Sequence, residues 1–322
     1  MITFNHEKFI AQAIEGVLMQ KTDFPVRLII GEDCSTDRTR EICIEYKNKY
    51  PDRITLRLPE KNMGGMGVAN FLANVDACVD GYKYVAMCEG DDYWTDPLKL
   101  QKQIDSMEAN AEIGMVYTDI KEFHQASGEF KAIPGAAVPD DKVVAELIRQ
   151  KYINFPSIAL RADLLADVMK TVGPELQGKV IGDTRIILEF AQRAKVHYIP
   201  EVTTVYRVVS GSASHPTNIG RFVFVADDTY QTRKNFVRRY KLNPKLLGIP
   251  VCNFNRAIIN NASVHPNYIK CVKLLSHLKI TDMVKYCDFA TFREKIDAKI
   301  IAKFLLSLIG VNALRNSLKN KR

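Results

Sequence analysis

Hydrophobic and polar positions alternate with two different periods along the first hundred residues. Short apolar runs predict buried strands, and stretches whose apolar residues recur every three or four positions predict amphipathic helices. The strand runs lie at 26–31, 53–58 and 82–88, behind a short strand at 1–5 that looks clipped at its start. The helical stretches lie at 6–20, 35–50 and 68–79. This alternation predicts a parallel, doubly wound α/β sheet, in which ligands bind beyond the carboxyl ends of the strands.

The pattern changes further along the chain. Residues 96–109 predict another helix and 113–120 another strand, followed by an irregular region up to about residue 160. A block from 178 to 214 predicts a helix near 183–193, a strand near 196–199 and then a polar loop. Beyond residue 220 the pattern is helical. With 322 residues, about half of them apolar, the chain is long enough for two or more compact units.

The net charge of +8 is concentrated at one end of the chain. Residues 293–322 hold eight Lys and Arg against two acids, so the rest of the chain carries little net charge. A nucleic-acid partner is therefore not expected, because it needs a basic folded face with a motif behind it. The seven cysteines are widely spaced and include no CxxC pair, which indicates reduced thiols rather than a disulfide scaffold or a zinc site.

Three carboxylates follow the predicted strand at 82–88, in the sequence MCEGDDYW. Glu89, Asp91 and Asp92 lie within four positions, and repulsion and desolvation both oppose such a cluster unless a cation balances it. Carboxylate oxygens suit Mg²⁺ or Mn²⁺, which proteins hold with one or two carboxylates and the phosphates of a substrate. The alternative is a solvated acidic turn or the anionic start of a helix.

Four segments in register resemble the nucleotide-binding half of family 2 glycosyltransferases: MITFNHEKFIAQAIEGVLMQ, LIIGEDCSTDRT, EKNMGGMGVANFLAN and YVAMCEGDDYW. A fifth segment looks like their acceptor half: IGDTRIILEFAQRAKVHYIPEVTTVYRV. The resemblance covers about residues 1–214. It implies the GT-A fold, an α/β architecture with a mixed sheet and flanking helices, to which this chain adds a C-terminal helical extension. It also implies a nucleotide-diphospho-sugar donor, a divalent cation (Mg²⁺ or Mn²⁺) and inversion at the anomeric carbon.

The resemblance implies where the donor nucleotide binds. Thr3 and Asn5 would lie at the mouth of its pocket. Asp33 would hydrogen-bond the base, for which uracil is expected, because a carboxylate accepts from a ring N–H. Asn62 and Gly64 would line the ribose and phosphate side, where glycine permits close backbone approach. Asn5 is equally suited to cap the following helix, and Gly64 to form a simple turn.

The resemblance gives the two adjacent aspartates different roles. Asp91 would contact the ribose or the donor sugar, and Asp92 would coordinate the metal. Glu89 stands where relatives often have Asp and would support the surrounding shell. Trp94, the only tryptophan, packs either as a platform beneath the site or in the core.

An inverting transfer needs a general base that deprotonates the acceptor hydroxyl. Asp183 matches the family's catalytic Asp by position, and its alternative role is a helix N-cap. Arg185 is expected to be a surface charge rather than a ligand for acceptor or phosphate. Arg207 would face the donor phosphates. Relatives often carry a His at the position of Val209, and His215 is the residue that could stand in for it.

The last segment of the chain predicts a basic amphipathic helix with Lys and Arg beside an apolar face: Ile300, Ile301, Phe304, Leu305, Leu308 and Ile309. Such a helix can lie in an anionic membrane interface, which suits a lipid-linked acceptor. The alternative is docking on the protein itself or on a second subunit. No run approaches the roughly 20 apolar residues of a membrane span. We therefore expect a cytoplasmic protein with peripheral contact at the inner face of the cell membrane.

The sequence predicts an inverting, metal-dependent glycosyltransferase that moves a sugar, expected to come from a UDP-sugar, to a glycan or lipid-linked acceptor. The expected domains are 1–110 for the nucleotide-sugar half, 111–218 for the acceptor half, 219–292 for a helical extension and 293–322 for the basic C-terminal helix. One alternative is a nucleotidyltransferase, which would need a Gly/Arg/Lys-rich phosphate loop near residue 5. Another is a catalytically inactive protein that binds nucleotide-sugars.

Overall fold

The computed structural model describes residues 1–133, 138–139, 142–149, 153–179, 182–212, 215–264, 274–287, 291, 295–296 and 299–301. The chain divides into two compact units. The first comprises Met1–Val144 and Tyr152–His215, and the second comprises Ala145–Lys151 and Pro216–Arg322. Among the described helices, none is both long and apolar enough to cross a membrane. The predicted basic helix lies outside the described residues from residue 302 onward.

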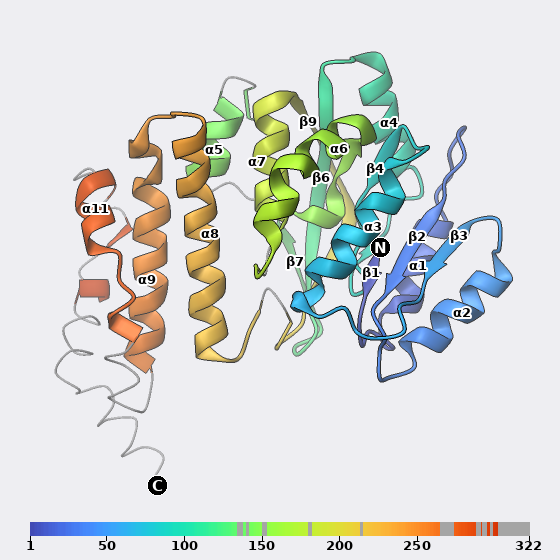
Figure 1. The fold of residues 1–322 in the computed structure, drawn as a ribbon, viewed down its shortest axis with the longest axis horizontal. Helices are drawn as coiled ribbons and strands as arrows, with labels where there is room; N and C mark the ends of the chain where they lie inside the picture. Colours follow the sequence, from blue (N-terminus) through green and yellow to red (C-terminus); the bar gives the residue numbers. More distant parts are fainter. Residues whose placement is uncertain are drawn as a thin grey trace, which may run out of the picture. The chain divides into compact units, whose positions relative to one another are not determined.

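Three parallel strands form the first sheet, in the order β1 (Ile2–Thr3), β2 (Leu28–Glu32) and β3 (Ile54–Arg57). Figure 1 shows them beside the helices that follow each strand: α1 (Ile10–Leu18), α2 (Thr39–Lys49) and α3 (Val68–Val79). Every residue of β2 is buried, which explains its continuous apolar run. The predicted parallel order is confirmed for these three strands.

Helix α1 buries the face that its sequence pattern predicts, through Ile10, Ala13, Ile14 and Val17. The prediction that Asn5 caps this helix is wrong. Asn5 has a left-handed backbone with φ 55°, and its Oδ1 accepts a hydrogen bond from the backbone N of Thr36 at 2.9 Å. The side chain therefore joins two loops, a use of Asn that the local sequence pattern does not distinguish from capping.

The other strands of the first unit that the structure describes form a second, mixed sheet in the order β4-β8-β6-β9-β5, with β7 beside β6. Their bounds are Tyr84–Ala86 (β4), Tyr93–Trp94 (β5), Ile113–His124 (β6), Glu129–Ile133 (β7), Ala159–Arg161 (β8) and Lys195–Val208 (β9). Strand β6 runs parallel to β9, whereas β4 runs antiparallel to β8. The mixed sheet agrees with the resemblance, but the expectation that 82–88 extends the parallel sheet is wrong.

Trp94 lies in the core, which decides between its two predicted roles. Its indole Nε1 donates to the backbone O of Pro156 at 2.9 Å. A Cβ on Gly16 of α1 would lie 2.9 Å from the backbone N and O of Trp94, so α1 and β5 pack at backbone contact. The helices that complete the first unit are α4 (Lys99–Ala109), α6 (Ala162–Val172) and α7 (Asp183–Arg193).

The second unit is helical, as the pattern beyond residue 220 predicts. Its described helices are α8 (Ile219–Arg239), α9 (Gly248–Val264) and α11 (Ile280–Tyr286), and α5 (Val143–Arg149) contributes most of its residues. Asp282 of α11 accepts hydrogen bonds from the Tyr230 hydroxyl at 2.8 Å and from Lys234 Nζ at 2.6 Å. These bonds tie α11 to α8 beside a buried apolar cluster.

Candidate active site

The carboxyl ends of β1 and β2 meet the loop that follows β4. Asp33 N donates to Thr3 O at 3.0 Å, and Gly90 N donates to Ile2 O at 2.9 Å. The short strand β1 therefore lies between two polar segments, which we call the β2–α2 loop (residues 33–38) and the acid loop (residues 89–92). The prediction that the strand ends gather polar residues along one edge is confirmed for these two loops.

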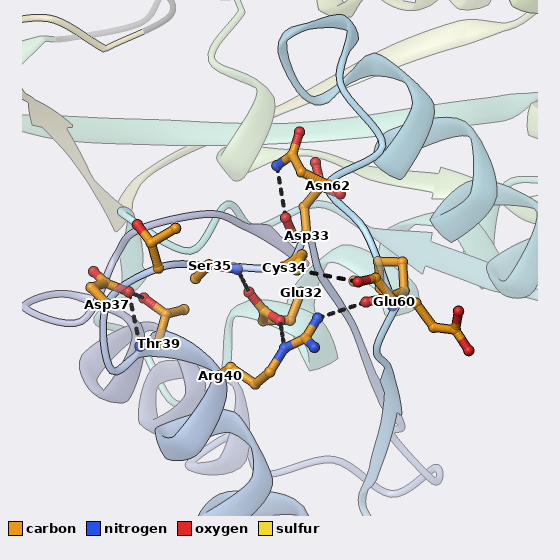
Figure 2. A network of polar contacts seen from close by, with 12 residues as sticks. Glu32, Asp33, Cys34, Ser35, Asp37, Thr39, Arg40, Glu60 and Asn62 are labelled. Carbon is orange, nitrogen blue, oxygen red and sulfur yellow. Dashed lines mark hydrogen bonds and ion pairs between the residues drawn. The ribbon is translucent and has the colours of Figure 1, made fainter.

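Glu32, at the end of β2, organises the β2–α2 loop from within the protein (Figure 2). Its side chain is fully buried. One carboxylate oxygen accepts from Ser35 N at 2.7 Å, and the other from Arg40 Nε at 2.5 Å. Arg40 also donates to Pro59 O at 2.8 Å. Glu32 is thus an internal anchor of the loop, since both of its oxygens are occupied.

Asp33 fixes the loop between β3 and α3 (Figure 2). Its Oδ1 accepts from Met63 N at 2.8 Å, and its backbone O accepts from Asn62 Nδ2 at 2.7 Å. Burial raises the pKa of Asp33, while the hydrogen bond from Met63 opposes this shift. Asn62 Oδ1 in turn accepts from Gly64 N at 2.9 Å. Asn62 is therefore committed to holding this loop, and its polar atoms support the turn rather than the predicted ribose contact.

Gly64 occupies a backbone conformation that favours glycine, with φ 70°. No heavy atom lies within 4 Å of where its Cβ would be, so the residue faces open space. The next three residues form a short 3₁₀ helix, η1 (Gly65–Gly67). Gly64 satisfies the turn interpretation, and its position also leaves room for a ligand against the backbone.

The acid loop gathers charge from two parts of the chain. Burial raises the pKa of Glu89 above its usual range, and the charges of Asp91 and Asp183 raise it further. Asp183 is the first residue of α7, more than 90 positions later in the sequence. The fold therefore brings Asp183 within electrostatic reach of the acid loop.

The two aspartates of the acid loop differ in environment. Asp91 is half-buried, whereas Asp92 is 1% exposed. Asp92 Oδ1 accepts from the backbone N of Arg207 at 2.7 Å, and its buried Oδ2 has no hydrogen-bond partner among the described atoms. Burial raises the pKa of Asp92 well above its usual range, followed by the charges of Asp91 and Glu89. The metal role of Asp92 stays a prediction, and Asp91 is the more accessible carboxylate of the two.

Arg207 is buried among aromatic rings, and its predicted phosphate contact stays a prediction. The residue is 7% exposed, and its guanidinium carbon lies 5.1 Å from the ring centroid of Phe9, 4.8 Å from Tyr93 and 5.6 Å from Phe123. Its Nη2 also donates to Gln12 Oε1. Stacking on aromatic rings stabilises a desolvated guanidinium, a role that its position in the sequence does not reveal.

Thr3 is also turned inward. Its side chain is buried, and its Oγ1 lies 3.1 Å from His6 Nδ1. A Cβ on Gly90 would lie 2.5 Å from Thr3 Oγ1, so the acid loop packs directly on this hydroxyl. The structure therefore gives Thr3 a supporting position instead of the predicted place at the pocket mouth. The adjacent Phe4 ring is 43% exposed, and the sequence interpretation missed it although an aromatic beside Asn5 was the available signal.

Asp183 opens α7 without capping it, since the N-cap position is Gly182 and no side-chain cap bond is formed there. Asp183 Oδ1 accepts from the adjacent Thr184 N at 2.6 Å. Arg185 was expected at the surface but is 7% exposed, because α7 packs inside the first unit. His215 lies within electrostatic reach of Asp91: burial lowers the pKa of His215, and the Asp91 charge opposes that shift.

The donor atoms at this site fit a hard divalent cation only in combination with a substrate. No three His, Cys, Asp or Glu side chains in the described part of the chain group closely enough to hold a metal by themselves. Asp91 is half-buried beside Glu89, and the charge of Asp183 adds to theirs. One or two carboxylates completed by phosphate oxygens is a common arrangement for Mg²⁺.

Comparison with known proteins agrees with this geometry. Residues 1–135 match the family model described as "Glycosyl transferase family 2". The match covers less than half of the chain, so the similarity to family 2 glycosyltransferases concerns its N-terminal part. Among its relatives is the uncharacterized protein Rv1520 of Mycobacterium tuberculosis, 32% identical over 211 residues that cover 64% of this chain and 57% of that protein. The dTDP-rhamnosyl transferase RfbG of Shigella flexneri is 30% identical over 110 residues, 34% of this chain and 37% of RfbG.

Solved structures show the fold of this chain. Residues 1–349 of Staphylococcus aureus TarS, in complex with UDP, superpose with a TM-score of 0.58 at 15% identity, covering 100% of this chain and 90% of that one. The mannosyltransferase PcManGT of Pyrobaculum calidifontis, with GDP-Man and Mn²⁺, gives a TM-score of 0.52 at 12% identity, covering 100% and 86%. The fold is GT-A, as the sequence resemblance implies.

Proposed function

We propose that the chain is an inverting glycosyltransferase that uses a nucleotide-diphospho-sugar and a divalent cation. The observation that carries this proposal is that the charges of Asp91 and Asp183 both act on Glu89, in a loop that shares strand β1 with the loop that holds Asp33. A donor recognised at Asp33 would present its diphosphate to the acid loop and its sugar to Asp183. Glycosyltransferase relatives and neighbour structures that contain UDP or GDP-Man support a donor of this class.

The nucleobase binds beside Asp33 and Phe4. The Oδ1 of Asp33 accepts from Met63 N, and its other carboxylate oxygen would accept from a base N–H. Phe4, the residue after β1, offers an exposed aromatic side chain, and stacking on an aromatic ring stabilises a base by about 1–3 kcal/mol. A pyrimidine such as uracil presents the required ring N–H, which makes a UDP-sugar our first choice of donor.

Asp91 contacts the metal together with the donor diphosphate. This assignment replaces the role first given to Asp92, whose carboxylate is buried and hydrogen-bonded to the backbone of β9. The cation, when bound, supplies Lewis-acid stabilisation of the departing nucleoside diphosphate. Asp92 anchors the acid loop, and Glu89 supports Asp91 from the buried side.

Asp183 acts as the general base. It takes the proton from the acceptor hydroxyl as that oxygen attacks the anomeric carbon, and the bond to the diphosphate breaks in the same displacement. No covalent enzyme intermediate is required. Asp183 is the first residue of α7 and its charge acts on Glu89 of the acid loop, which supports this role.

The acceptor is a glycan or a lipid-linked glycan, as in the assembly of bacterial surface polysaccharides. The basic segment 293–322 supports a peripheral place at the inner face of a membrane, because Lys and Arg near anionic lipid contribute about 1 kcal/mol each. Cosedimentation with anionic liposomes tests this assignment. Truncation after Lys295 should abolish binding, and unchanged partitioning would mean that the segment docks on protein.

Donor hydrolysis measured on the wild type and on Asp91→Asn tests the proposed function. The full-length protein should first be screened by thermal shift with UDP-sugars, dTDP-sugars and GDP-sugars, each with and without MnCl₂, because a ligand of the native state raises its stability. A metal-dependent shift without hydrolysis or transfer would favour an inactive nucleotide-sugar-binding protein. Nucleotide transfer from a nucleoside triphosphate would favour a nucleotidyltransferase. Full metal-dependent turnover by Asp91→Asn would refute the metal assignment.

A further inference from the structure

His6 lies beside both loops of the candidate site. Its Nδ1 is 3.1 Å from Thr3 Oγ1. A Cβ on Gly90 would meet Thr3 Oγ1 at 2.5 Å, Thr3 Cβ at 2.7 Å and His6 Nδ1 at 2.9 Å. The backbone of the acid loop therefore rests directly on the pair formed by Thr3 and His6, and only glycine fits at its point of contact.

The backbone of His6 is fixed to the other loop. His6 N donates to Thr39 Oγ1 at 2.7 Å, and Thr39 Oγ1 donates to Asp37 Oδ1 at 2.6 Å. Asp37 Oδ2 also accepts from Glu7 N at 3.1 Å. Thr39 is fully buried, so this chain of hydrogen bonds is protected from competition by water. The ring of His6 touches the acid loop while its main chain is held at the start of α2.

We propose that His6 is a positioning residue that couples the β2–α2 loop to the acid loop. It sets the separation between Asp33, which recognises the base, and Asp91, which meets the metal and the diphosphate. The inference rests on the proposed function, since the coupling concerns the two ends of one donor. A displacement of about 1 Å between such groups can cost 10²-fold in rate, so a rigid spacer between them has a catalytic consequence.

The positioning role predicts an effect that general destabilisation does not. Without metal, the nucleotide binds through contact of its base with the β2–α2 loop. This contact does not require the ring of His6. The extra affinity that Mn²⁺ gives depends on both loops at their correct separation. Removing the ring should therefore reduce the manganese-dependent gain and leave metal-free binding almost unchanged.

The experiment is calorimetric titration of full-length protein with UDP, dTDP and GDP, each with and without MnCl₂. His6→Ala and Thr3→Val should bind the preferred nucleotide within about two-fold of wild type without metal, and should lose about ten-fold of the manganese-dependent gain. His6→Asn, which retains a polar atom near the position of Nδ1, should restore the gain. His6→Gln, which places that atom one bond further out, should not. His197→Ala, at an exposed site on β9, serves as the matched control.

The outcomes separate this inference from the proposed function. If His6→Ala and Thr3→Val both keep the wild-type increase in affinity with Mn²⁺, the positioning role is overturned and the proposed function is not. Equal losses with and without metal, accompanied by a lower Tm in both variants, also overturn it, because they indicate a purely structural residue. Absence of any manganese effect on wild-type binding of the three nucleotides overturns the proposed metal-dependent donor site, and this inference with it.

Discussion

Replacing Lys99 with Met tests the electrostatics of the core beneath the site. Lys99 is 0% exposed, and its Nζ lies 4.4 Å from the ring centroid of Trp94 and 2.6 Å from Gln103 Oε1. A cation–π contact and one amide hydrogen bond compensate only part of the lost hydration of an ammonium group. Burial accordingly lowers the pKa of Lys99 from 10.5 to about 7.

The lowered pKa of Lys99 makes stability depend on pH in one direction. Between about pH 7 and pH 10.5 the unfolded chain keeps a proton that the folded chain has released, so the free energy of unfolding rises with pH. Each pH unit in this window contributes about 1.4 kcal/mol, which gives about 3 kcal/mol between pH 7 and pH 9. Below pH 7 Lys99 is protonated in both the folded and the unfolded chain. The cost of burying its charge is then present in full, and the free energy of unfolding no longer changes with pH through this residue.

Lys99→Met should remove this slope, because it keeps a long apolar side chain and removes the titrating group. The unpaired Gln103 oxygen would add a cost of about 1–3 kcal/mol that does not vary with pH. Urea unfolding from pH 6 to pH 9, followed through the fluorescence of Trp94, measures the difference. Lys102→Met is the control, since this partly exposed lysine of the same helix pairs with Asp96 and Glu201 and stays charged throughout. Parallel stability curves for wild type and Lys99→Met would refute the reasoning.

Three further predictions concern the candidate site and the second unit. Asp183→Asn should lower sugar transfer by about 10²–10⁴-fold with nucleotide binding unchanged, because only the base is lost; wild-type initial rates would place the base elsewhere. Gly90→Ala should lower turnover by about 10²-fold, because its Cβ would lie 2.5 Å from Thr3 Oγ1 and displace the acid loop. Normal turnover at a normal Tm would contradict that packing. Oxidation by diamide should join Cys252 and Cys287, whose Sγ atoms lie 2.9 Å apart, with the two thiols losing two protons and two electrons. Intact-mass analysis should show the loss of two hydrogens in wild type and not in Cys252→Ser, and an unchanged wild-type mass would count against the pairing.

Local periodicity was sufficient to predict which face of a single helix or strand is buried. The spacing of Ile10, Ile14 and Val17 predicts a buried helix face, and the structure buries these residues. The continuous apolar run of β2 predicts a strand covered on both faces, and all of its residues are buried. The helix predicted near 183–193 is α7, because its sequence is strongly amphipathic and follows a glycine.

Features that depend on distant partners could not be read from the sequence. Strand β4 resembles its three predecessors in composition, yet it pairs with β8, which aligns Val85 with Leu160. The choice of partner depends on segments that meet only after folding. Arginine side chains usually lie at the protein surface, yet Arg185 and Arg207 are both buried. Their burial results from packing that no local sequence pattern encodes. The resemblance located the site, but it did not show which of its polar side chains face a ligand.

The adjacent aspartates of the acid loop show how these two kinds of information combine. Residues 89–92 form a turn closed by the hydrogen bond from Asp92 N to Glu89 O at 3.2 Å, and within it Asp91 is half-buried whereas Asp92 is buried. Asp92 is buried, and its Oδ1 accepts a hydrogen bond from the backbone N of Arg207 at 2.7 Å. This bond joins the acid loop to β9. Because Asp92 is fixed inside, the half-buried Asp91 is the accessible carboxylate beside Glu89, within electrostatic reach of His215. The like charges are thus tolerated through separate partners, and the buried aspartate determines where the accessible one meets its ligand.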